Sequence, residues 1–353
     1  MDNIKLVFDI DDTICNNKNR DYENAIPYKD VIKKINKLHK QGAKITLYTS
    51  RGMVSCNGDI KKIIKKNKTI LEKWLEKNKV EYDELIFGKP LGDIYVDDKA
   101  INVRDFLNQD FKELSGHSGY KVIRLGNLVK KEMSEENYIK LIDWYKESKN
   151  VAKSPKITSN LYSTVYMEYI EGKNAYNCLN KRLLDKIINQ ILKFKEIKYK
   201  TFNQDILIKK LEKHKSNNDN FWNALVNECQ DLIRKLDLKQ YASLSHYDMT
   251  LANIIVKDND IYLLDSLLDK EASSYLLDFA KLKMSLDGYE ELFCGGKHIH
   301  KIYSLYLSYK LMKMGILREV NILEYMWAIR LYNYNKNKNL VKQFALERRK
   351  EIW

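Results

Sequence analysis

Proline and paired cysteines are scarce in this sequence. Three prolines in 353 residues leave no proline-rich linker, and the five cysteines are odd in number, widely spaced and without a CxxC pair. This cysteine pattern indicates free thiols in a reducing compartment. No apolar run approaches the length that spans a bilayer, and the N-terminus leads into a strand-like segment with no basic region before it. We therefore expect a cytoplasmic protein with neither a membrane span nor a signal peptide.

Negative charge is in the minority. The sequence has 62 Lys and Arg residues against 48 Asp and Glu, a formal net charge of +14. Most of the excess is lysine in helical patterns such as 59–79, where it falls between apolar positions on a face expected to be solvated. A nucleic-acid surface is normally richer in arginine and more clustered, so the composition favours a lysine-rich soluble protein.

Strand and helix patterns alternate over residues 4–108. Apolar runs of strand length occupy 4–9, 44–48, 84–88 and 93–98, and helical periodicity occupies 28–42 and 60–78. This alternation predicts an α/β domain with a parallel sheet covered by helices. After residue 108 the pattern changes, so we predict two domains, 1–108 and 109–353.

Polar residues follow the predicted strands of the first domain. The carboxyl ends of parallel strands meet at one edge of the sheet, so these side chains should lie close together there. They are Asp9, Asp11, Thr49, Lys89, Asp97 and Asp98. Such a set would suit phosphoryl chemistry: one carboxylate attacks phosphorus, another acts as acid and base, and Thr and Lys hold phosphoryl oxygens. Mg²⁺ would offset the repulsion between the carboxylates.

These segments resemble the four motifs of the haloacid dehalogenase (HAD) superfamily of phosphatases, namely "DIDDT", "ITLYTSR", the lysine of "FGKP", and "IYVDD". More narrowly, "YTSRG" and "IFGKP" are similar to small phosphatases encoded among bacterial capsule and surface-polysaccharide genes. The resemblance implies an N-terminal HAD-like, Rossmannoid parallel sheet. The intervals between the motifs leave no room for a large cap domain, so the site should be open.

The resemblance also implies a role for each residue. Asp9 would be the nucleophile and Asp11 the general acid and base, while Thr49 and Lys89 would hold the phosphoryl group. The Mg²⁺ ligands would be Asp9, Asp11 and Asp97, with Asp98 a further ligand or a neighbour of the ligands. Asp12 would be a turn residue. The alternative is a flavodoxin-like sheet whose acidic residues merely begin loops.

The second domain is predicted to be α+β and bilobal. A small lobe, about 109–172, would hold a glycine-bearing loop at 115–119, a hairpin that turns at Gly126 and Asn127, a helix at 134–148 and a strand at 163–172. A large lobe, about 173–353, shows amphipathic helical patterns except for a hairpin around "KDND" at 257–260.

Asp248, Asn253 and Asp265 form a second group of metal and acid-base candidates around that hairpin. A kinase-like transferase needs an Asp near the substrate hydroxyl, and an Asn and a second Asp that share Mg²⁺ around ATP. The spacing HxDxxxxN, then a hydrophobic strand and Asp, resembles the aminoglycoside phosphotransferase and choline kinase group. That resemblance implies Asp248 as catalytic base and Asn253 and Asp265 as metal ligands. His246 would support this loop and Asp278 would brace it.

The small lobe would supply the ATP contacts. Lys130 is the candidate for the lysine that holds the α- and β-phosphates, with Lys131 as its rival. Glu136 could pair with that lysine, although Glu132 and Glu135 compete. Segment 115–119 could cover the phosphates. The segment 167–172 resembles a hinge whose backbone binds adenine, and its central residues are Glu168, Tyr169 and Ile170.

The leading hypothesis is a bifunctional enzyme, a Mg²⁺-dependent phosphatase and an ATP-dependent kinase that act on sugars, polyols or their phosphates in surface-polysaccharide precursor synthesis. One alternative is a phosphatase whose kinase-like domain is silent and binds a partner. Another is a nucleic-acid end-processing enzyme, but such enzymes carry a P-loop kinase and no GxxxxGK[ST] motif occurs here. His298 and His300 form an HxH pair, for which surface histidines are favoured over a zinc site because no third ligand is evident.

Overall fold

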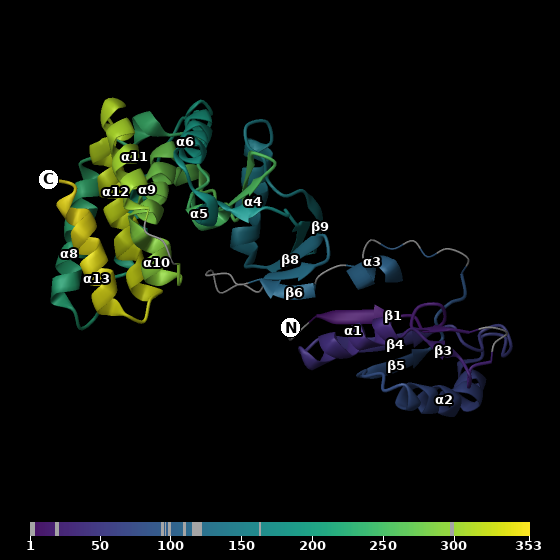
Figure 1. Cartoon of the computed structure of the whole chain (residues 1–353). Coiled ribbons are helices and arrows are strands. Elements are labelled where there is room, and N and C mark those ends of the chain that lie inside the picture. The colour runs from purple at the N-terminus through teal and green to yellow at the C-terminus, as the bar shows by residue number, and fades with distance from the viewer. Residues whose placement is uncertain are drawn as a thin grey trace. The chain divides into compact units, whose positions relative to one another are not determined.

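The structure is a computed structural model, shown in Figure 1. It describes residues 4–17, 21–92, 95, 97, 100–108, 111–114, 122–161, 164–296 and 300–353. The chain forms two compact units, the first made of Met1–Gly116 with Lys121–Lys131 and the second of His117–Tyr120 with Glu132–Trp353. Each unit is described by itself, and the domain boundary at 108 stays a prediction.

The first unit contains a three-stranded parallel sheet. Its strands are β1 (Lys5–Phe8), β4 (Lys44–Thr49) and β5 (Glu84–Phe87), in the order β1-β4-β5. Phe8 pairs with Leu47 and Thr49 with Phe87, so all three strands end at the same edge. The predicted strands at 4–9, 44–48 and 84–88 are confirmed, whereas the one at 93–98 lies largely outside the described residues.

Helices α1 (Lys29–Lys40) and α2 (Ile60–Lys77) follow the predicted periodicity. In α1 the buried side chains recur at helical spacing and end with Leu38, and in α2 the Asp59 carboxylate caps the first turn by accepting from the Lys62 N–H. The lysines of α2 lie on its exposed face, as expected. The sequence did not predict α3 (Val103–Asn108) or the short hairpin of β2 (Cys15–Asn16) and β3 (Ile26–Pro27).

Antiparallel strands follow. In the first unit β6 (Phe111–Leu114) pairs with β7 (Val122–Leu125), which pairs with β8 (Leu128–Glu132), the strand at the boundary of the unit. In the second unit β9 (Ile157–Leu161) pairs with β10 (Thr164–Glu168). The predicted hairpin is β7–β8, and Gly126 at its turn has φ +64°, a conformation that glycine adopts without strain. Helix α4 (Glu135–Ser148) confirms the helix predicted at 134–148. The loop at 115–119 lies outside the described residues.

The large lobe is mostly helical, as predicted. Its helices are α5 (Ala175–Cys178), α6 (Lys181–Lys195), α7 (Asp205–Glu212), α8 (Asn220–Arg234), α9 (Tyr275–Met284), α10 (Glu290–Phe293), α11 (Lys301–Lys313), α12 (Leu317–Arg330) and α13 (Lys338–Lys350). A π-helical turn, Ser285–Tyr289, separates α9 from α10 at Gly288, which has φ +104°. Helix α9 packs along α12 (Figure 1). Nine of the ten residues of α9 are buried.

The predicted hairpin in this lobe is also confirmed. Strands β12 (Ile254–Lys257) and β13 (Asp260–Leu263) pair antiparallel, and β11 (Lys173–Asn174) adds to β12. Asp258 and Asn259 at the turn have φ +49° and +66°, the two left-handed residues of a tight hairpin turn. None of the helices in the described part of the chain has the length and hydropathy needed to cross a membrane.

Candidate active sites

The carboxyl edge of the parallel sheet brings together three of the predicted phosphatase residues. Lys89 Nζ lies 3.2 Å from Asp9 Oδ2, so the predicted nucleophile and a predicted phosphoryl-binding cation are neighbours. The Lys89 N–H also donates to the Thr49 carbonyl at 3.1 Å, which ties the segment after β5 to the end of β4. Thr49 is fully buried, and its hydroxyl accepts from the Arg51 N–H.

Asp11 is held by an arginine that sequence reasoning did not assign to the site. Arg51 is 2% exposed, and its Nε and Nη2 donate to the Asp11 carboxylate at 2.8–3.1 Å. The Asn17 amide donates to the same carboxylate, and the Tyr22 ring lies 4.5 Å from the guanidinium carbon. A metal that bound the Asp11 side chain would therefore compete with Arg51 for the carboxylate.

The remaining predicted residues of this site are less informative. Asp12 has φ +58°, which fits the predicted turn role because Asp tolerates the left-handed region better than most residues. Asp97 is exposed and no metal-ligand role for it is shown. Asp98 lies outside the described residues. The metal set of Asp9, Asp11, Asp97 and Asp98 therefore stays a prediction.

In the second unit, Asp248 is held by two partners. Lys281, from α9, places Nζ 3.0 Å from Asp248 Oδ1, and the Asn253 amide donates to both the carbonyl and Oδ2 of Asp248 at 2.9 Å. Burial raises the pKa of the Asp248 carboxyl, but the charge and hydrogen bond of Lys281 outweigh it, so the pKa lies below its usual value. Asp248 is therefore ionised at neutral pH.

The backbone connects this loop to Asp265. The Leu264 N–H donates to the Asn253 carbonyl at 2.9 Å, and the Leu267 N–H donates to the His246 carbonyl at 3.2 Å. Asp265 lies between these two anchors, beside Asn253. Since the Asn253 amide nitrogen makes both bonds to Asp248, its oxygen is left for another partner.

Asp278 holds the loop in place, as predicted. Its carboxylate accepts from the Ser245 hydroxyl and from the N–H groups of His246 and Tyr247, all at 2.8–2.9 Å. Burial raises the pKa of Asp278 to about 7. Three donors on a fully buried carboxyl group fix the backbone just before Asp248.

The backbone on both sides of the site is strained. Tyr247 has φ +70° and Asp265 has φ +60°, and a bulky residue such as Tyr rarely adopts this region. Such strain persists where the surroundings fix it and is typical of functional sites. His246 is fully buried edge-on against Trp144, and burial lowers its pKa to about 4, so it is a neutral support of the loop.

The predicted hinge follows β10. Glu168 and Tyr169 are half-buried and Ile170 is buried. A Cβ added to Gly172 would lie 2.5 Å from the Val256 carbonyl oxygen, so only glycine allows the hinge this close to β12. The predicted hinge is thereby fixed against β12, the strand that follows the loop with Asp248.

The predicted phosphate-binding pair is not established. Lys130 lies half-buried in β8 within the first unit, and Lys131 is buried. Glu136 lies in the second unit, where it is exposed and forms an ion pair with Lys140 on its own helix at 2.5 Å. The pairing of Lys130 with Glu136 stays a prediction.

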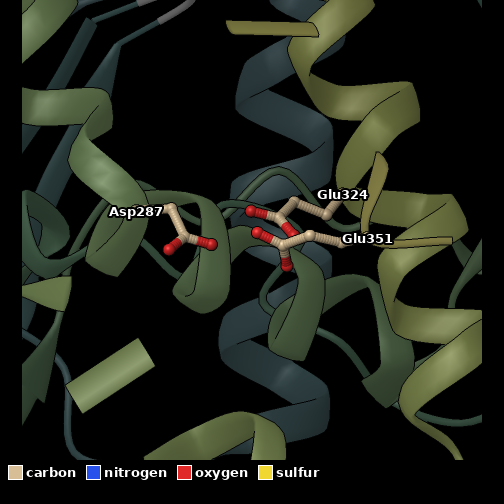
Figure 2. A group of neighbouring side chains, drawn as sticks. All are labelled: Asp287, Glu324 and Glu351. Carbon is tan, nitrogen blue, oxygen red and sulfur yellow. The ribbon is translucent and has the colours of Figure 1, made fainter. Parts of the chain in front are cut away.

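Three further carboxylates, Asp287, Glu324 and Glu351, gather between α9, α12 and α13 (Figure 2). Their spacing would suit a metal ion, but two cations of the chain already lie among them. Lys283 contacts all three, at 2.8 Å from Glu324 and 3.0 Å from Asp287, and Arg348 also pairs with each. This cluster is a buried ionic network that joins three helices.

Solved structures provide the comparison with known folds. An amicoumacin kinase, solved with AMP-PNP, Ca²⁺ and Ami, matches with a TM-score of 0.51 and 11% sequence identity, over 68% of this chain and 88% of that chain. The chain has a kinase-like fold. APH(2")-IIa in its gentamicin complex matches over 73% of this chain and 96% of that chain, with a TM-score of 0.45 and 17% identity. A target protein from Vibrio cholerae is 34% identical over 30% of this chain and 89% of that chain, with a TM-score of 0.30. Neither a protein-family model nor a curated protein sequence matches the chain.

The sequence analysis missed one residue of this site, Lys281. Lys281 follows Asp278 by one helical turn, so Asp278 supports the loop while Lys281 meets the carboxylate that the loop presents. The lysine-rich pattern concealed it, because lysine on a helix is normally solvated. The sequence feature that could have identified Lys281 is its position in a helix with apolar residues around most of its circumference, which indicates a buried helix.

Proposed function

We propose that the second unit transfers a phosphoryl group from ATP to an alcohol group of a small molecule. The observation that carries this proposal is the joint placement of Asp248, Asn253 and the Asp265 segment by direct hydrogen bonds. Asp248, ionised and aimed by two partners, would accept the proton of the acceptor hydroxyl as it attacks the γ-phosphorus. The amicoumacin kinase with the same fold binds an ATP analogue.

The residues present fit a magnesium ion. Mg²⁺ prefers carboxylate and amide oxygens. Asn253 offers an oxygen outside its bonds to Asp248, and Asp265 follows Leu264, whose N–H donates to the Asn253 carbonyl. When bound, the ion would neutralise charge on the phosphates. The chain would hold adenine at Glu168, Tyr169 and Ile170, and Lys130 is our candidate for the phosphates.

For the first unit we propose a phosphomonoesterase. Asp9 would attack phosphorus and form an aspartyl phosphate as the ester oxygen leaves with a proton from Asp11, and water activated by Asp11 would then release phosphate. The ion pair of Asp9 with Lys89 supports this assignment, as does the buried Thr49, which a backbone hydrogen bond joins to Lys89. The Lys89 ammonium and the Thr49 hydroxyl are both groups that can bind phosphoryl oxygens. Mg²⁺ would bind at Asp9, with Asp97 and Asp98 as further candidates.

The two activities must act on different positions or molecules, since on one phosphate they would only hydrolyse ATP. We propose sugar or polyol substrates, with the kinase adding phosphate at one hydroxyl and the phosphatase removing it from another. Relocating a phosphate in this way prepares a sugar for nucleotide activation. We place it in the cytoplasm, in precursor synthesis for capsular or surface polysaccharide.

Two substitutions in the full chain test the proposal. Asp9→Asn should abolish phosphate release from an aryl phosphate and leave acceptor-dependent ADP formation intact. Asp248→Asn should do the reverse. Phosphorus NMR of a panel of sugars, polyols and their phosphates, with and without ATP, would identify both substrates. A wild-type protein that does not bind Mg-ATP would contradict the kinase assignment and favour a silent partner-binding domain.

A further inference from the structure

We infer that the acceptor at the Asp248 site carries an anionic group, a phosphomonoester, which binds Arg330 and Trp327 beside Lys281. This inference rests on the proposed kinase function and names the class of its acceptor. It follows from the charges and unused donors around one indole ring.

Trp327 lies next to the proposed base. Its ring centroid is 4.3 Å from Lys281 Nζ, and Lys281 Nζ is 3.0 Å from Asp248 Oδ1. Tyr247, the residue before Asp248, packs edge-on against the same ring at 5.5 Å. A molecule whose hydroxyl meets Asp248 therefore has Trp327 within reach.

The ring is already occupied by cations of the chain itself. Arg330, one helical turn after Trp327, places its guanidinium carbon 4.3 Å from the ring centroid, the same distance as Lys281 Nζ. An aromatic face is where a protein would bind a cationic ligand. With two positive charges on this ring, a cationic acceptor would meet repulsion.

Donors in this cluster lack acceptors. Within the described part of the chain, Arg330 Nε and Nη1 and Trp327 Nε1 are buried and have no hydrogen-bond partner. Buried donors are normally satisfied, and an unpaired one is costly, more so when it is charged. Three such N–H groups on adjacent side chains indicate a site for an oxygen-rich ligand.

The charges leave one cation unbalanced. Lys281 is paired with Asp248, and Lys210 is paired with Asp269 at 2.8 Å while it donates to Tyr247. Arg330 forms no ion pair with a described carboxylate. His214 beside it supplies no negative charge, and burial, with help from Arg330, lowers its pKa to about 4. A phosphate supplies both the charge and the acceptors, and it binds arginine strongly.

The test compares acceptors in the full-length Asp9→Asn protein, which should not remove phosphate from them. ADP formation is measured with glucose, glucosamine, gluconate and glucose 6-phosphate, and with glycerol and glycerol 1-phosphate. We expect each phosphate to be used at least tenfold better, in kcat/KM, than its neutral parent, and glucosamine to be used least. Equal or better use of a neutral or cationic acceptor overturns the inference and leaves the kinase function standing. Preference for gluconate over glucose 6-phosphate overturns the phosphomonoester assignment.

Substitution of Arg330 gives a second measurement. In the same background, Arg330→Gln should raise KM for the phosphorylated acceptor about tenfold to hundredfold and leave KM for ATP unchanged. Arg330→Lys, which keeps the positive charge, should raise the acceptor KM less than Arg330→Gln does. Thermal unfolding of the two variants and of the parent protein shows whether each is folded. The matched control is Arg234→Gln, whose partner Asp231 is exposed, and it should change neither KM. An unchanged acceptor KM in Arg330→Gln overturns the inference.

A binding measurement separates the two proposals. If no acceptor stimulates ADP formation, the kinase function fails, and calorimetry with glucose 6-phosphate then decides the inference alone. Binding that is weakened by Arg330→Gln but not by Arg234→Gln supports an anion site here. Equal binding of glucose 6-phosphate to Arg330→Gln and Arg234→Gln overturns the inference.

Discussion

Replacement of Lys283 by Met should destabilise the helical lobe more than any exposed ion pair could. The Lys283 side chain is 1% exposed and contacts Asp287, Glu324 and Glu351 (Figure 2). Its loss leaves two buried carboxylates, Asp287 and Glu324, and the exposed Glu351 with Arg348 as the one remaining cation of this network. Removing one partner of a buried ion pair typically costs about 3–5 kcal/mol, because the other charges stay buried without compensation.

The size of the effect can be measured by thermal unfolding. For a unit of this size, 1 kcal/mol shifts Tm by about 2–4 °C, so Lys283→Met should lower Tm by about 6–20 °C. The matched control is Lys153→Met, which breaks an ion pair with Asp260 whose two side chains are about half exposed, and it should change Tm little. If Lys283→Met loses no more than this control, the buried network does not stabilise the lobe.

Three further predictions concern the hinge, a buried histidine and the loop support. Gly172→Ala should destabilise the protein by about 1–3 kcal/mol and raise KM for ATP, because its Cβ would meet the Val256 carbonyl at 2.5 Å; urea unfolding and kinetics check both. His214 has a pKa of about 4 when folded against 6.5 unfolded, so the unfolded state binds more protons in this window, and stability falls as pH drops from 6.5 to 4. His214→Phe should remove this contribution, up to about 3 kcal/mol, and an unchanged pH slope would contradict it. Asp278→Asn should lower kcat at least tenfold with little change in KM for ATP, because it perturbs three hydrogen bonds that position the loop before Asp248.

Local signals predicted much of the fold. The hairpin around "KDND" was predictable because Asp258 and Asn259 tolerate the positive φ that its turn requires. The α1 and α2 helices were predictable from apolar spacing. Strand β9 was missed because "ITSNL" is polar and lies at the edge of its sheet, where packing decides less. The π-helical turn was also missed, because Gly288 lies inside an otherwise regular helical pattern.

Partners across the fold were harder to predict than the site residues themselves. The motif spacing located Asp9, Asp11 and Asp248, but Arg51 lies 40 residues from Asp11, and its contact depends on how two strands align. Lysine composition misled in the same way. The lysine-rich composition predicted solvated lysines, and the lysines of α2 are indeed exposed. In α9, however, Lys283 is fully buried and Lys281 is 12% exposed.

The carboxylates that we assign to acid-base or nucleophilic chemistry share one arrangement. Asp9 lies beside Lys89, Asp11 beside Arg51, and Asp248 beside Lys281. In each pair the cation comes from a different element of the fold than the carboxylate, and Lys281 lowers the pKa of Asp248. A cation placed there could also bind the oxygens of the phosphoryl group whose phosphorus Asp9 would attack or whose transfer Asp11 or Asp248 would assist. In the proposed phosphatase and kinase reactions, each of these cations would leave its carboxylate partner and bind the phosphoryl group. Substituting Lys281 by Met should therefore affect two properties of the kinase at once, the pKa of Asp248 and the binding of the transferred group.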